Sequence, residues 1–304
     1  MYKRSDMYAK KVEHNNMIYS VDKLRLKTFI SYNDFCEIEY FLKVVHSDKI
    51  KRFWISDKKS NFRYNYNLEI EEGKSFSIHF MHNSESVSYH KDFKLYNFTI
   101  EFNPNKLKDN SLLLYILDSF SNWLLRSFDL AIDIPISILD LIIDKSGKRR
   151  FHTISNGGDD VTFYNGSKDT DGYMKIYNKK KESDLPIPGE LTRVEVSRKY
   201  EDYDIKGIVT YDFGEQYLPN IYLNQYVISL SDIQNKKDKT LLAVLYAIQH
   251  GYPINDLSVV YRKKIKELLK GSSKIKFDKK SAGNALRQIL FYYFVRPGSK
   301  QVFY

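Results

Sequence analysis

The stretch TFYNGSKDTDGYMKIYNKKKE, residues 162–182, alternates apolar and polar side chains on both sides of a turn rich in Gly and Asp. We expect two antiparallel strands here, residues 161–165 and 173–179, joined by that turn. Because alternate side chains of a strand point to opposite faces, Met174 and Ile176 share an apolar face. The opposite face then carries Tyr173, Lys175, Tyr177 and Lys179.

Two further segments repeat this design. One is FDLAID, residues 128–133, and the other is LTRVEVS, residues 191–197. In both, the apolar side chains predict a core-facing surface, and the other surface carries the charged groups Asp129, Asp133, Arg193 and Glu195. If the three strands join one sheet, these groups converge in a groove. The solvated face of an ordinary antiparallel sheet has the same pattern, so the pattern alone leaves both interpretations open.

The segments on the N-terminal side extend the predicted sheet. Residues 17–30 alternate as a strand, and residues 31–48 are typical of a helix capped by Ser31 or Asn33. Residues 51–102 contain the alternating runs of several antiparallel strands. In this region His79 and His82 are three residues apart, so we expect them on opposite faces of a strand and not as a metal-binding pair.

Helices are expected after the N-terminal strands and in the last third of the chain. Residues 111–126 predict a strongly apolar helix packed on the sheet. After residue 206 the pattern becomes increasingly helical, with predicted helices over residues 239–249, 257–269 and 281–294. The sequence therefore predicts an α+β fold, with an antiparallel sheet, packed helices and a mainly helical C-terminal part.

The composition indicates the class of partner. The 304 residues carry a formal net charge of +10, which favours polyanionic partners through counterion release. The 25 Tyr and 19 Phe suit stacking on exposed bases, although an AT-rich coding sequence also enriches Tyr. With Cys36 as the single cysteine, no disulfide can form within the chain. No run of 18 apolar residues is present, and we expect a soluble, cytoplasmic protein.

The polar face of the three strands offers the groups that phosphodiester cleavage requires. A tyrosine oxygen can hold a covalent phosphate. Two or three carboxylates can hold a divalent cation that polarises a phosphoryl oxygen. Lysine and arginine can bind phosphate oxygens, arginine with a bidentate fork.

At these segments the chain resembles the Rep_trans-type replication initiators, the rolling-circle initiators of small plasmids, some phages and some integrative elements. The family pattern is a Gly-Ser turn, a basic-x-Tyr-x-Lys-x-x-Glu strand and then Thr-Arg-x-Glu. Here these positions are Gly166, Ser167, Lys175, Tyr177, Lys179, Glu182, Thr192, Arg193 and Glu195. FDLAID is similar to the family's Arg-x-Asp-x-Ala-x-Asp strand, except that Ser127 stands where the family has Arg. The resemblance covers about residues 100–200.

The resemblance implies a curved antiparallel sheet and an initiator that nicks one DNA strand at an origin. Such a DNA-nicking endonuclease and strand transferase forms a 5′-phosphotyrosine link and frees a 3′-OH for a polymerase. Mg²⁺ or Mn²⁺, a host helicase and a homodimer are expected with it. The chain then divides into a flexible basic arm (residues 1–16), a catalytic nicking domain (residues 17–205) and a helical region (residues 206–304) for DNA recognition or dimerisation.

The expected roles follow from the resemblance and the chemistry together. Tyr177 is the first candidate for the nucleophile, Tyr173 the second and Tyr164 the third. Lys179 and Arg193 are expected at the phosphate. The metal ligands are expected to be Asp129 and Glu195, with Asp133 and Glu182 as weaker candidates. The expected DNA-backbone contacts are Lys175, Lys148, Arg149 and Arg150.

Two other functions remain open at this point. A non-catalytic origin-binding or copy-control protein on the same scaffold is possible, since Ser127 removes a phosphate contact unless Arg126 supplies it. A tyrosine recombinase would use a tyrosine near the C-terminus, such as Tyr292 or Tyr293, but the Arg and His set that it needs is not evident.

Overall fold

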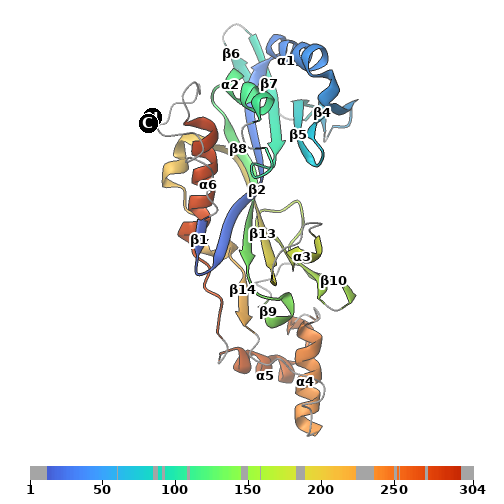
Figure 1. Ribbon diagram of the computed structural model, residues 1–304, viewed down its shortest axis with the longest axis vertical. Coiled ribbons are helices and arrows are strands. Elements are labelled where there is room, and N and C mark those ends of the chain that lie inside the picture. Colours follow the sequence, from blue (N-terminus) through green and yellow to red (C-terminus); the bar gives the residue numbers. More distant parts are fainter. Residues whose placement is uncertain are drawn as a thin grey trace.

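One antiparallel sheet of twelve strands forms the body of the part of the chain that the structure, a computed structural model, describes (Figure 1). The described residues are 12–59, 61–84, 88–90, 93–107, 110–144, 150–157, 159–182, 189–223, 236–249, 252, 254–270 and 273–295. The strand order is β10-β11-β12-β13-β8-β2-β7-β5-β4-β3, with β1 paired to β2 and β6 to β7. A separate two-stranded sheet pairs β14 with β9.

The strands are β1 (Val12–His14), β2 (Met17–Ser31), β3 (Ile50–Ile55), β4 (Phe62–Glu71), β5 (Lys74–His82), β6 (Ser88–His90), β7 (Phe93–Phe102), β8 (Leu124–Ile134), β9 (Leu141–Asp144), β10 (Phe151–Gly157), β11 (Asp160–Asn165), β12 (Tyr173–Asn178), β13 (Thr192–Asp204) and β14 (Asn220–Leu223). The α-helices are α1 (Tyr32–Val45), α2 (Ser111–Ser119), α3 (Lys179–Glu182), α4 (Lys236–Gln249), α5 (Val259–Lys270) and α6 (Lys279–Phe294). Short 3-10 helices are η2 (Ser47–Lys49), η3 (Ile138–Asp140), η4 (Ile205–Thr210), η5 (Glu215–Tyr217) and η7 (Ile254–Asp256). The predicted α+β class is confirmed.

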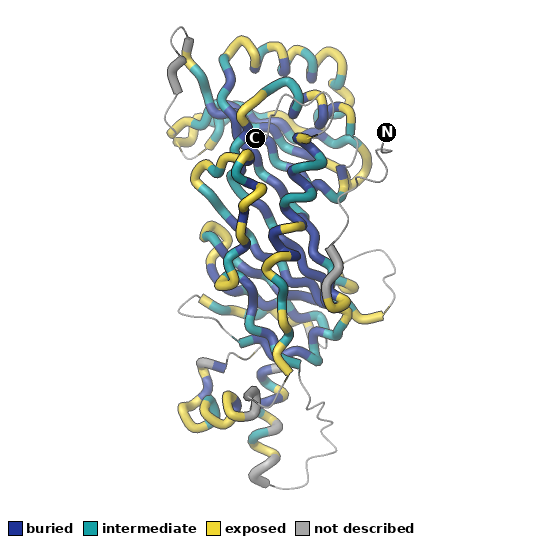
Figure 2. Tube along the Cα trace, turned by 90° about the vertical axis from the view of Figure 1, so that its left-hand side faces the viewer, coloured by how far each residue is buried: buried dark blue, intermediate teal, exposed yellow. Residues whose placement is uncertain are grey.

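The hydrophobic core lies on one face of the large sheet. Helices α1, α2 and α6 add their apolar side chains to the same core as the strands. In β8, Phe128, Leu130 and Ile132 are fully buried, as the alternation in FDLAID predicts. Figure 2 shows the buried residues running along the sheet.

The helices of the C-terminal third pack in two separate places. Helix α6 packs against β2 and β8 in the main core (Figure 1). Helices α4 and α5 instead form a smaller apolar cluster around Ile142 of β9, and Figure 1 shows them at the lower end of the molecule. The three helices predicted in this third are all present. Among the described residues, no helix has both the length and the apolar character to cross a membrane.

Two boundaries differ from the sequence prediction. The helix expected over residues 111–126 ends at Ser119, and β8 begins at Leu124. Between them Asn122 has a φ of 59°, and the buried indole of Trp123 donates to the Leu117 carbonyl at 3.0 Å, which turns the chain back into the sheet. Of the basic arm expected over residues 1–16, residues 1–11 lie outside the described part, whereas Val12–His14 form β1.

Ser31 is the cap of α1, and this assignment gives a first testable prediction. Its hydroxyl accepts from the Asp34 backbone N–H at 3.1 Å, and the Asp34 carboxylate accepts from the Ser31 N–H at 3.0 Å. We expect Ser31→Ala to lower the free energy of unfolding by about 1 kcal/mol, measured by urea denaturation. Asn33→Ala is the matched control, because this second candidate lies inside α1 and should leave stability within about 0.5 kcal/mol. Equal losses in both variants contradict the assignment.

Candidate active site

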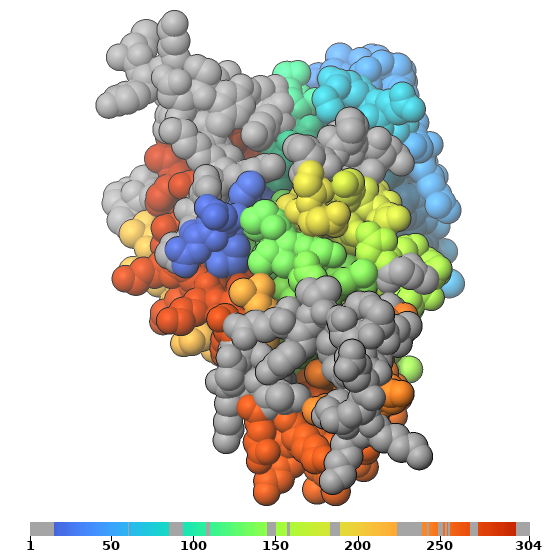
Figure 3. All heavy atoms as spheres, turned by 60° about the horizontal axis from the view of Figure 1, so that its bottom comes forward, coloured from blue at the N-terminus to red at the C-terminus, as the bar shows by residue number. Residues whose placement is uncertain are grey.

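The three polar strand segments lie side by side, as their shared pattern predicts. Strand β12 pairs with β13 so that Tyr177 faces Arg193 and Lys175 faces Glu195. Strand β13 pairs with β8 so that Arg193 faces Asp133. Figure 3 shows segments far apart in the sequence, coloured from blue through green to yellow, side by side on one surface. The titratable groups of these strands therefore converge on one face.

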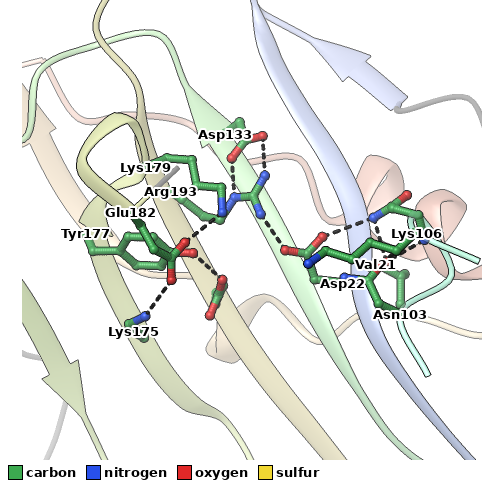
Figure 4. Close-up of polar contacts among 12 residues, drawn as sticks. Val21, Asp22, Asn103, Lys106, Asp133, Lys175, Tyr177, Lys179, Glu182 and Arg193 are labelled. Atoms are coloured by element: carbon green, nitrogen blue, oxygen red, sulfur yellow. Dashed lines mark hydrogen bonds and ion pairs between the residues drawn. The ribbon is translucent and has the colours of Figure 1, made fainter. Parts of the chain in front are cut away.

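Tyr177 is the most enclosed tyrosine of this face, with 3% of its surface exposed. Its hydroxyl donates to Glu195 Oε1 at 2.5 Å (Figure 4). The Lys175 ammonium lies 3.9 Å from the centre of the phenol ring. Burial raises the pKa of the Tyr177 phenol above its usual value, and the Glu195 carboxylate raises it further. The phenol therefore keeps its proton in this state, next to a carboxylate that can accept it.

Glu182 covers this tyrosine from helix α3. Its two oxygens accept from Lys175 at 3.3 Å and from Lys179 at 2.7 Å (Figure 4). Burial alone raises the pKa of Glu182, but the hydrogen bond from Lys179, the nearby Tyr177 hydroxyl and the charges of both lysines outweigh it and bring the pKa down to about 2. Lys179 begins α3 instead of ending the strand as expected, yet its ammonium is still 5.8 Å from the Tyr177 ring centre.

Arg193 forms a nearly buried ion-pair network. Its guanidinium donates to both oxygens of Asp133, at 2.6 and 2.7 Å, and also to Asp22 (Figure 4). Only 8% of Arg193 and 4% of Asp133 is exposed. The guanidinium expected at a phosphate thus already uses three of its N–H groups in holding β13 to β8 and β2.

Asp22 is a site residue that the sequence prediction missed. It is the extra residue of a β-bulge in β2, where the pairing with β8 shifts between Val21 and Lys23. A bulge re-aims a side chain, and here it turns the Asp22 carboxylate toward Arg193 and Asn105. The sequence contains a signal for the bulge, because the apolar residues change their spacing from two to three between Val21 and Leu24.

An open cleft of about 450 Å³ lies on the polar face beside the Tyr177–Glu195 pair. Its walls are Lys23, Arg25, Glu101, Ser127, Asp129, Tyr164, Lys168, Asp169, Tyr173, Lys175, Glu195, Ser197 and Lys199. Tyr173 and Tyr164 therefore face the open space, whereas Tyr177 lies behind it. Tyr164 also stacks on His152 at 4.6 Å between ring centres, so an aromatic row leads from the cleft toward β10.

Only two of the four expected metal ligands lie in this cleft. Asp129 and Glu195 line it, and burial raises the pKa of both carboxyls. Asp133 forms an ion pair with Arg193, and Glu182 forms ion pairs with Lys175 and Lys179. Among the described residues, no group of three or more Asp, Glu, His or Cys side chains could hold a metal by itself.

The expected DNA contacts are divided between the cleft and the loop at residue 150. Lys175 lines the cleft, together with Lys168 and Lys199, which the sequence prediction did not include. Lys148 and Arg149 lie outside the described residues, and Arg150 is exposed. Ser127 stands where the family has Arg. Arg25 of β2 faces Ser127 and lines the same cleft, so it brings a guanidinium next to this position.

The chain is similar to curated replication initiation proteins. Two such proteins of Staphylococcus aureus are 36% and 33% identical to it over 118 residues, which cover 36% of this chain and 37% of each relative. A third, also from Staphylococcus aureus, is 34% identical over 118 residues, or 38% of its length. These matches confirm the predicted resemblance to replication initiators. The matched part spans little more than a third of the relatives.

The structure of the rolling circle replication initiator protein from Geobacillus stearothermophilus aligns with 86% of this chain and 99% of that chain, at 11% identity and a TM-score of 0.36. No family model matches the chain.

Proposed function

We propose that this protein is a rolling-circle replication initiator that nicks one DNA strand with Tyr177 as the nucleophile. The similarity to replication initiation proteins supports the process. The observation that carries the chemistry is the 2.5 Å hydrogen bond from Tyr177 to Glu195, with the Lys175 ammonium over the phenol ring. A nucleophile within hydrogen-bond reach of its base is the arrangement that covalent catalysis needs.

In the proposed step, the Tyr177 oxygen attacks the phosphorus of one phosphodiester while Glu195 accepts the phenol proton. The bond from phosphorus to the 3′ oxygen breaks, and that oxygen receives a proton and leaves as a 3′-OH. The 5′-phosphate stays on Tyr177 as a phosphotyrosine. Transfer of the strand back to a 3′-OH is the same step in reverse, which accounts for strand-transferase activity.

The scissile phosphate must first reach the buried Tyr177, and the contacts of Lys175 and Lys179 suggest a route. Lys175 and Lys179 hold the Glu182 carboxylate beside the tyrosine at 3.3 and 2.7 Å. A scissile phosphate offers the same kind of anionic oxygens, and charge-assisted bonds to it can replace those to Glu182. We propose that the arriving phosphate displaces Glu182 from both ammonium groups and thereby uncovers Tyr177.

Asp129 and Glu195 are the residues that fit a divalent cation, Mg²⁺ or Mn²⁺. Both carboxylates line the cleft, and neither forms an ion pair with another side chain of the described part. One or two carboxylates together with substrate phosphate oxygens are the usual ligands of Mg²⁺. The cation supplies Lewis acidity at a phosphoryl oxygen.

This assignment predicts an effect of metal on stability. Because burial raises the pKa of Asp129, its ionised form destabilises the fold at neutral pH, and stability returns as the pH falls through that raised pKa. We expect Mn²⁺ at about ten times its Kd to stabilise the protein by about 1.4 kcal/mol, or about 3 °C in Tm.

The variants for this test are Asp129→Asn and Asp48→Asn, compared by thermal melts with and without Mn²⁺. Asp129→Asn should melt no lower than the wild type without metal, and Mn²⁺ should leave its Tm unchanged. Asp48 is exposed and remote from the cleft, so its variant should keep the whole shift. A Mn²⁺ shift that survives in Asp129→Asn shows that the cation binds elsewhere.

The proposed partners are origin DNA, single-stranded at the nick, a host helicase and a second copy of the chain. A dimer would suit an initiator that must cleave and rejoin. Of the two recombinase candidates, Tyr293 has none of its surface exposed and Tyr292 is partly buried against the same core, which favours the initiator.

The proposed function is tested with a labelled single-stranded oligonucleotide from the element's own origin. Incubation with the full chain and Mn²⁺ should give one nick and a covalent adduct on a denaturing gel. Both products should disappear with a chelator. Tight binding in a native gel without any nick or adduct would overturn the proposal and leave the origin-binding, copy-control alternative.

A further inference from the structure

A second pocket lies on the polar face, toward the other end of the sheet. It measures about 320 Å³, within the range of small-ligand sites. Strands β2, β3, β4, β5 and β8 supply its main side chains, namely Arg25, Trp54, Phe62, His79, His82 and Arg126. None of the described residues that line it is a carboxylate. The pocket thus combines aromatic rings with cationic groups.

Both histidines line this pocket, although simple alternation in a strand predicts opposite faces. The reason is Met81, which has a φ of 58° and so breaks the alternation between them. As a result the Phe62 ring contacts both imidazoles, His79 at 5.4 Å and His82 edge-on at 4.8 Å between ring centres. The irregular backbone at Met81 therefore builds one continuous aromatic wall.

The hydrogen bonds of Asn65 fix the state of His79. The Asn65 side-chain amide donates to the Phe62 carbonyl at 2.8 Å, so its oxygen is the group that meets His79 Nδ1 at 2.9 Å. Nδ1 must then carry the proton, and Nε2 is an acceptor. Burial, with the nearby Arg25 charge, lowers the pKa of His79 to about 4, so the ring is neutral at neutral pH. An uncharged acceptor suits the amino edge of a base.

Arg25 connects this pocket with the candidate active site. It lines both cavities, since on β2 it faces Glu101 of β7 on one side and Ser127 of β8 on the other. Its Nε has no hydrogen-bond partner, although it lies 3.5 Å from Glu101 in an ion pair. Arg126 adds a second guanidinium to the pocket wall. Phosphates of a strand crossing the cleft can therefore follow cationic groups into the pocket.

We propose that this pocket binds one nucleotide of the DNA strand that crosses the candidate active site, with its base beside Trp54 and Phe62 and its phosphate at Arg25 and Arg126. The inference rests on the proposed function, because it takes the ligand to be the same single strand. Base-on-aromatic stacking tolerates any sequence, since every base has a π-face. The pocket anchors the strand next to the cleft, since Arg25 lines both.

Tryptophan fluorescence tests the proposal without any cleavage. The chain has two tryptophans, and Trp123 is fully buried, so Trp54 is the accessible reporter. We expect a single-stranded oligonucleotide, titrated without divalent metal, to quench the emission of the full chain. Trp54→Phe should remove the change in emission, and Trp54→Ala should weaken binding about tenfold by fluorescence anisotropy. Tyr40→Ala, at an exposed position of α1, is the matched control and should bind as the wild type does.

A second variant and a second ligand make the result decisive. His82→Ala should also weaken oligonucleotide binding, which covers the case that the Trp54 variants do not fold. Deoxythymidine monophosphate is the second ligand. Equal quenching by this nucleotide and by the oligonucleotide at equal concentration overturns the strand assignment in favour of a free nucleotide. Oligonucleotide binding without quenching, unaffected by either variant, overturns the pocket itself. Because no nick is measured, failure of the nicking proposal is seen separately.

Discussion

Tyr177→Phe is expected to abolish the covalent adduct and to lower nicking of a single-stranded origin oligonucleotide by at least about 10³-fold. The substitution removes only the attacking oxygen, and the ring beneath the Lys175 ammonium remains. The measurement is a single-turnover nicking assay with Mn²⁺ on a denaturing gel. DNA binding by anisotropy should stay within about twofold of the wild type, because no phosphate contact is lost.

Tyr173→Phe is the matched control for this experiment. Tyr173 lies on the same strand, four residues before Tyr177, and lines the open cleft. Among the described residues, no carboxylate lies at hydrogen-bond distance from its hydroxyl to act as a base. We expect this variant to keep the adduct and most of the nicking rate. An adduct lost in Tyr173→Phe and kept in Tyr177→Phe would preserve the nicking function and transfer the nucleophile to Tyr173.

Arg193→Met should have the largest effect on stability, a loss of about 3–5 kcal/mol in the free energy of unfolding. The substitution leaves the Asp133 and Asp22 carboxylates without their shared cation, and Asp133 is 4% exposed. Removing one partner of a buried ion pair is costly because the remaining charge stays desolvated. Urea denaturation followed by circular dichroism measures the change.

Lys199→Met is the control, because it removes a cation from the same strand where the ammonium is exposed and bonds only to the Lys168 carbonyl. Its effect should stay within about 0.5 kcal/mol. Adding Asp133→Asn to Arg193→Met should recover part of the lost stability, since it removes a buried charge. A small loss in Arg193→Met, coupled to a large loss of DNA affinity, would instead make Arg193 a phosphate-binding residue.

The strand faces around the site could be predicted because period-two alternation is a local property. Residues 128–133 and 173–178 each send every second side chain into the core, and the structure shows these positions buried. The alternation fails where the backbone changes its phase. The bulge at Asp22 and the positive φ of Met81 each do so, and they decide where Asp22 and His82 point. The bulge shows in the sequence only as the three-residue spacing from Val21 to Leu24, and the residue type of Met81 does not signal its positive φ.

The partners of the site residues were harder to predict, because they depend on strand register. The sequence placed Arg193 at a phosphate, but in the structure its guanidinium pairs with Asp133, and Lys175 forms its ion pair with Glu182. Asp22 and Arg25 come from β2, more than 160 residues before β13, so no local pattern connects them with Tyr177. The helix expected over residues 111–126 was too long. The run from Trp123 to Leu125 is apolar, and such a run fits the end of a helix as well as the start of a strand.

The place of β8 in the sheet has a consequence for folding on the ribosome. This strand, residues 124–134, pairs with β2 on one side and with β13 on the other, so the Arg193–Asp133–Asp22 network spans 171 residues of sequence. Contacts this distant form slowly, because a long loop must close before they stabilise anything. Helix α6, which packs on β2, is synthesised later still. A nascent chain therefore cannot assemble the cleft, whose walls run from Lys23 to Lys199, until β13 has been made, and it lacks the packing of α6 on β2 until later still.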